Sequence, residues 1–175
     1  MKRARQFPII RTLFAASLLC VLSLSVRAQQ EAETVSQPPG AMTTDIPGPE
    51  QVADDAVRFD AVDVFVDAGQ ESLAAWQFEF QSRTEGVEIV GIEGGDHPAF
   101  AAPPFYDPKA MMHNRVILAA FSTAEKLPTG RSRVARIHLQ LTGPGSKSCE
   151  TQLTTCATAD GRKIAATHSI AVAAK

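Results

Sequence analysis

The chain has few of the side chains that usually mark catalysis or ligand binding. Its 175 residues include one Trp, one Tyr, three Cys and four His, and aromatic residues make up only 6% of the total. The histidines and cysteines form no H-x3-H or C-x2-C pair, so the sequence has no zinc-type motif. It also lacks G-x-S-x-G, the turn that exposes a nucleophilic serine in many hydrolases. We therefore expect a non-catalytic protein without a metal or cofactor.

The first 28 residues are typical of a secretory signal peptide. Basic residues precede an apolar stretch at 13–26, and Val26 and Ala28 occupy the third and first positions before the expected cleavage site. The expected product is exported to the periplasm or beyond the cell. The stretch is shorter than the roughly 20 apolar residues that span a bilayer, which disfavours a retained membrane anchor. Bulky leucines before Cys20 disfavour the other alternative, a lipoprotein.

Removal of this segment would make the protein acidic. Its five charged residues are all basic, so 12 basic and 19 acidic residues would remain, a formal charge of −7. Such a balance disfavours nucleic acid as a partner, because binding needs a positive surface against the phosphates. It also disfavours docking on anionic lipid. No second long apolar stretch follows, so we do not expect an integral membrane protein after processing.

Composition divides the rest of the chain into two parts. Residues 29–56 hold four prolines and no aromatic side chain, a composition that predicts a disordered linker. Hydrophobic residues become frequent from Val57 onward. Residues 57–173 have the length of one domain and show no internal repeat.

Within this domain apolar and polar side chains alternate with a period of two, the pattern of half-buried β-strands. In the clearest run, Trp76, Phe78 and Phe80 share one face, which predicts a core position for the single Trp. Residues 115–121 are apolar on both parities and fit a strand covered on both faces or on one. Further strands are predicted at 62–66, 87–92, 135–141, 150–158 and 164–172. About seven to nine short strands predict an all-β, two-sheet β-sandwich.

Cys149 and Cys156 would remain in a compartment where disulfides persist. If 150–158 is a strand, seven residues at about 3.3 Å each separate their Cα atoms by roughly 23 Å, against a bridging limit near 7 Å. The odd spacing also predicts side chains on opposite faces. Two unpaired thiols are therefore favoured over a disulfide, which would require the strand prediction to be wrong.

Four segments in order carry a family resemblance. They are VDVFVDAGQESLAAWQFEF, VEIVGIEGG, FYDPKAMMHNRVILAAFS and LPTGRSRVARIHLQL. Together they resemble the cohesin-like, carbohydrate-binding-module-related jelly-roll domains of secreted bacterial proteins. The resemblance covers residues 57–173 and implies a jelly roll of about nine strands that binds a protein or a glycan. Membership of a cellulosome is not implied, because the chain has a single such domain and no dockerin-like calcium loop.

The long loop that begins near residue 96 holds the candidate binding residues. Loops of more than about 12 residues are uncommon unless they are functional or disordered. This one carries Phe100, Phe105, Tyr106 and Asp107, which we predict to contact a protein partner. A glycan is the alternative ligand, because exposed aromatic rings also stack on sugars.

The histidines are the remaining candidates for metal or acid–base chemistry. Residues that this loop could bring together are Asp96, His97, Asp107 and His113, but their spacing by itself predicts no metal site. The other two histidines are expected in structural settings. We predict a solvated His138 on the polar face of its strand and a hydrogen-bonded His168 in the core.

Overall fold

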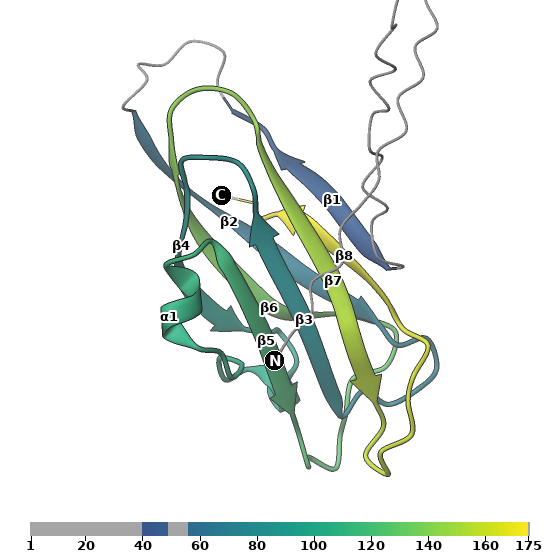
Figure 1. Cartoon of the computed structure of the whole chain (residues 1–175). Coiled ribbons are helices and arrows are strands. Elements are labelled where there is room, and N and C mark those ends of the chain that lie inside the picture. Colours follow the sequence, from purple (N-terminus) through teal and green to yellow (C-terminus); the bar gives the residue numbers. More distant parts are fainter. Residues whose placement is uncertain (1–39, 49–55, 175) are drawn as a thin grey trace, which may run out of the picture. The chain divides into compact units, whose positions relative to one another are not determined.

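The computed structural model describes residues 40–48 and 56–174 (Figure 1). These residues form two four-stranded antiparallel sheets, which confirms the predicted two-sheet β-sandwich. The strands of the described residues are β1 (Ala41–Ile46), β2 (Val57–Asp67), β3 (Ala75–Ser82), β4 (Val87–Gly94), β5 (Arg115–Phe121), β6 (Arg131–Thr142), β7 (Lys147–Ala157) and β8 (Thr167–Val172). Two short helices, η1 (Pro98–Phe100) and α1 (Pro108–Met111), lie between β4 and β5 in the chain.

Successive strands alternate between the two sheets. Sheet A has the order β1-β7-β3-β5 and sheet B the order β4-β6-β2-β8. Every connection between consecutive strands therefore passes from one sheet to the other, in agreement with the predicted jelly-roll topology. On one side of the sandwich α1 contacts both β4 and β5, the edge strands of the two sheets (Figure 1).

The core lies between the sheets and is built from the inward-facing residues of the alternating strands. Trp76, Phe78 and Phe80 of β3 are buried, as their alternation predicted. Facing side chains of sheet B include Val62, Val64, Val66, Ile137, Leu139 and Leu141. Burial of one such large apolar side chain contributes about 1.5–3 kcal/mol, so the period-two pattern accounts for most of the stabilisation.

β1 corrects the prediction of a disordered linker. It pairs with β7 from Ala41 opposite Gln152 to Ile46 opposite Lys147, and Ile46 is fully buried. The composition of the segment is that of a linker, but a single apolar anchor and the backbone hydrogen bonds of an open sheet edge are enough to add a short strand. The rest of the predicted linker up to residue 39 and at 49–55, and the predicted signal peptide, lie outside the described residues.

A β-bulge in β7 corrects the predicted orientation of the cysteines. Cys149 and Cys156 are unpaired thiols of one strand, as predicted. However, the pairing of β7 with β3 shifts register at Thr154, which has no partner in β3. One extra residue reverses the alternation of side chains, so both cysteines are buried despite their odd spacing. Burial raises the pKa of each thiol to about 11, and both are therefore protonated at neutral pH.

The other predicted strands all occur, but β2, β6 and β7 begin three to five residues earlier than predicted, and the last strand is shorter. β8 begins at Thr167, whereas the prediction began at Ile164. Ile164 is still buried, and its N–H donates to the Cys156 carbonyl at 2.9 Å in the connection that follows the turn at Gly161. In the described part of the chain, no helix is long and apolar enough to cross a membrane.

Candidate functional site

The segment after β4 folds back against the sandwich at two glycines, the last residue of β4 and the residue that follows it. A Cβ atom on Gly94 would lie 2.3 Å from the carbonyl oxygen of Ala101, and one on Gly95 would lie 2.2 Å from that of Arg133. Neither distance can accommodate a side chain, so this close approach of backbones requires glycine at both positions. The pair places η1 directly against the sheet.

Three of the four candidates for metal or acid–base chemistry have structural partners. The Nδ1 of His97 accepts a hydrogen bond from the backbone N–H two residues later at 3.2 Å, and Asp107 Oδ1 accepts one in the same way at 2.9 Å. These side chains cap η1 and α1. Arg133 Nε donates to Asp96 at 2.9 Å and thereby holds the pKa of that carboxyl below its usual range. His113 is exposed. Within the described ranges, no three His, Cys, Asp or Glu side chains lie close enough together to hold a metal ion.

The four predicted partner-binding residues have different surroundings. Phe100 is 3% exposed, and its ring meets that of Trp76 edge-on with a centroid distance of 6.2 Å. This corrects the prediction for Phe100, because folding back of the glycine-led segment carries its side chain into the core. Tyr106 is half-buried against the core, whereas Phe105 and Asp107 are exposed. Of the predicted aromatics, Phe105 alone is thus largely available to a partner.

Phe105 and Phe121 form an exposed aromatic pair. The N–H of Phe105 donates to the Ala119 carbonyl at 2.7 Å, and its carbonyl accepts from the Ala119 N–H at 3.0 Å. These bonds hold Phe105 beside β5, where its ring stacks on Phe121 with centroids 6.1 Å apart and planes 12° from parallel. The two side chains are 70% and 68% exposed. Both rings are therefore held by the backbone of the sandwich and remain open to solvent.

β5 is covered on one face only. Val116 and Leu118 point into the core, whereas Ile117 is 38% exposed on the outer face, together with Phe121. We define the β5 patch as Phe105, Ile117 and Phe121. Exposed groups of large apolar side chains mark interaction surfaces more often than single exposed ones. The apolar residues on both parities of 115–121 were the signal in the sequence for this patch, since one parity is not needed by the core.

Polar side chains of β3 flank the β5 patch. Gln77 lies directly opposite Ala119, and Glu79 lies opposite Ile117. Glu79 accepts a hydrogen bond from Arg115 Nε at 2.7 Å. An apolar centre beside a polar border is the arrangement found in protein interfaces.

The outer face of sheet B has a different character, because its charges neutralise one another. Arg136 donates to both carboxylate oxygens of Asp63 at 2.7 and 3.0 Å, and Arg133 Nη1 lies 3.5 Å from the same carboxylate. His138 Nε2 lies 2.9 Å from Glu93 Oε1, which agrees with its predicted place on a polar face. Sheet B therefore carries ion pairs as well as its exposed Val57, Phe59 and Val90, whereas the β5 patch consists of apolar side chains alone.

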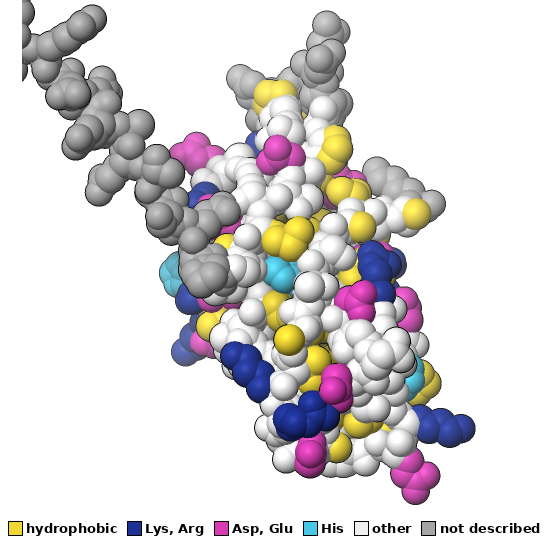
Figure 2. All heavy atoms as spheres, turned by 90° about the vertical axis from the view of Figure 1, so that its right-hand side faces the viewer, with side chains coloured by type: hydrophobic (Ala, Val, Ile, Leu, Met, Phe, Trp, Pro, Cys, Tyr) yellow, Lys and Arg dark blue, Asp and Glu magenta, His cyan; other side chains and the backbone are white. Residues whose placement is uncertain are grey.

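His168 of β8 connects the two sheets at the opposite side from α1. Its Nε2 lies 3.2 Å from the hydroxyl oxygen of Thr151 in β7, and its ring meets Phe78 edge-on at 5.5 Å. The hydrogen bond agrees with the prediction, but the side chain is half-buried on the edge strand β8 and does not lie in the core, and this partial burial lowers its pKa. Figure 2 shows this side of the molecule, where hydrophobic side chains lie among polar and charged ones.

Comparisons with known proteins do not assign a family. No protein-family model, curated protein or solved structure matches the chain. The cohesin-like resemblance therefore stays a prediction, and function has to be argued from the surface of the sandwich.

Proposed function

We propose that the protein is an exported, non-catalytic interaction module that binds a protein partner through the β5 patch. The observation that carries this proposal is the exposure of Phe105 and Phe121 on backbone that is already ordered. Aromatic residues are enriched at the centres of protein interfaces, where a few of them supply most of the binding energy. The proposed export rests on the signal-like sequence of residues 1–28.

The size of the contribution follows from the exposed area. A phenylalanine buries about 150–250 Å² when fully covered. Phe105 and Phe121 are 70% and 68% exposed, so each has roughly 100–170 Å² left to bury. At about 25 cal/mol per Å² this corresponds to about 2.5–4 kcal/mol per ring. The two backbone hydrogen bonds at Phe105 reduce the entropic cost of ordering the ring on binding.

A glycan-binding module is the second candidate function, and the geometry of the aromatic pair favours it specifically. Two rings with nearly parallel planes present flat apolar surface of the kind on which a sugar ring stacks. Gln77, on the neighbouring strand opposite Ala119, supplies an amide that can donate to and accept from hydroxyl groups. The same residues therefore have to be tested against both ligand classes.

The test compares Phe105→Ala/Phe121→Ala with Phe59→Ala, an exposed phenylalanine on sheet B. The immobilised full chain first captures proteins from an envelope extract of the native cell, and the affinity of each purified candidate is then measured. We expect the double variant to weaken binding of the true partner by about 30-fold or more, equivalent to about 2 kcal/mol, and Phe59→Ala to bind like the wild type.

A glycan array with the same three proteins distinguishes the two candidate functions. A glycan that binds the wild type but not the double variant would establish the second candidate and exclude a purely protein-binding role. If the double variant, shown by circular dichroism to be folded, kept every ligand of the wild type, the β5 patch would not be the binding site.

A further inference from the structure

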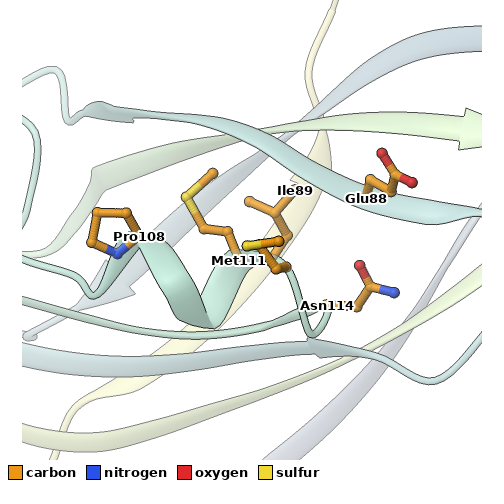
Figure 3. Close-up of a pocket in the computed structure, with 6 residues that line it drawn as sticks. Glu88, Ile89, Pro108, Met111 and Asn114 are labelled. Atoms are coloured by element: carbon orange, nitrogen blue, oxygen red, sulfur yellow. The ribbon is translucent and has the colours of Figure 1, made fainter.

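A pocket of about 410 Å³ lies between α1 and β4, and none of its residues belongs to the β5 patch. Its lining residues are Glu88, Ile89, Pro108, Met111, Met112 and Asn114. Figure 3 shows Pro108 and Met111 on the α1 side of the pocket, with Ile89 and Glu88 on the strand β4. The helix and the edge strand thus border an open pocket lined by thioether, carboxylate and amide groups.

The second methionine of this pocket is not needed by the fold. Met111 packs against the core, whereas Met112 is 82% exposed, although both line the same pocket. The next residue, His113, is also exposed. Two adjacent thioether side chains therefore line one pocket, and an exposed imidazole follows them in the chain.

We propose that Met111, Met112 and His113 bind a soft monovalent cation, Cu(I) or Ag(I). Thioether sulfur is a soft, polarisable donor that selects Cu(I) over the hard cations Mg²⁺ and Ca²⁺, and imidazole also suits copper. Methionine is unbranched and has three rotatable bonds, so two adjacent thioethers can turn toward one ion. The carboxylate of Glu88 adds a negative charge to the pocket, and this charge attracts the cation.

The other sulfur atoms of the described residues do not compete for the cation. Cys149 and Cys156 are buried in the core with protonated thiols. Met42 is exposed, but it belongs to β1 and does not line the pocket. It therefore provides an internal control for non-specific binding to a surface methionine.

The test is a titration of the full chain with Ag(I), which needs no reductant. The chain carries Cys20→Ser, to remove a thiol outside the described residues, and methionine labelled with ¹³C at the methyl group. We expect the methyl resonances of Met111 and Met112 to shift and to saturate at one equivalent of Ag(I), while that of Met42 stays in place. Equal shifts of all methionines, or shifts that do not saturate, would overturn the proposal.

Variants provide the second arm of the test. Met111→Leu/Met112→Leu preserves side-chain size and should weaken Ag(I) binding by about tenfold or more, whereas Met42→Leu should leave it unchanged. Met112→Leu alone gives a control for folding, because this exposed side chain adds nothing to the core, and it too should weaken binding. Unchanged affinity in the double variant would exclude the site, and unchanged affinity in His113→Gln would exclude the imidazole as third ligand.

Discussion

Replacement of Phe100 by alanine should lower the free energy of unfolding by about 3–5 kcal/mol. The side chain is 3% exposed and belongs to the core. Its removal forfeits the free energy gained by burying the ring, and it leaves a cavity that the surrounding strands can close only in part. Loss of the edge-on contact with Trp76, at a centroid distance of 6.2 Å, places the expected value toward the upper end.

Urea denaturation followed by tryptophan fluorescence measures this effect directly, because Trp76 is the only Trp and contacts the substituted ring. In thermal unfolding the midpoint should fall by about 10–20 °C. The matched control is Phe105→Ala, a residue of the same loop that is 70% exposed and should change stability by about 0.5 kcal/mol or less. If Phe100→Ala stayed within about 1 kcal/mol of the wild type, the loop would not fold inward as described, and Phe100 would again be a candidate binding residue.

Two further predictions concern titratable groups that are buried or half-buried. Burial raises the pKa of Cys149 and Cys156 to about 11, so neither thiol should react with an aromatic disulfide reagent at pH 8 in the folded Cys20→Ser chain. Both thiols should react once the chain is unfolded in urea. Rapid reaction before unfolding would contradict the burial of the two cysteines in the core. Burial lowers the pKa of His168 in the folded state below 6.5, the value for the unfolded chain. Between these two pKa values the unfolded chain binds more protons than the folded one. The free energy of unfolding should therefore fall as the pH falls from about 6.5 toward the folded-state pKa. Urea titrations should show that His168→Gln loses less stability than the wild type between pH 7.5 and pH 5.5. An equal loss of stability in both proteins would refute the contribution of His168 to this pH dependence.

Much of the fold could be predicted from local patterns in the sequence. Alternation in 76–81 predicted both the strand β3 and the burial of Trp76, because successive side chains of a strand point to opposite faces. The same reasoning located β2, β4, β5 and β6 and indicated two packed sheets. It could not identify β1, whose stability comes mainly from pairing with β7, more than one hundred residues away along the chain.

The candidate site was predictable only in part. The sequence indicated the correct loop and Phe105, but it could not separate Phe105 from Phe100, since both are phenylalanines among small residues and prolines. Their different exposure results from the close backbone contacts at Gly94 and Gly95 and from the bridge to Ala119. Phe121 was visible in the sequence as part of a strand that is apolar on both parities, but its stacking partner was not.

By itself the sequence determined the period of the strands, the alternation of core and surface residues and the absence of familiar catalytic motifs, because these depend on neighbours a few residues apart. The tertiary structure alone decided which apolar side chains the two sheets leave uncovered. It also decided that an extra residue at Thr154 turns both cysteines inward and that Met111 and Met112 line one pocket with Glu88. These outcomes depend on register and on contacts between distant segments, which are set only when the sheets pack against each other.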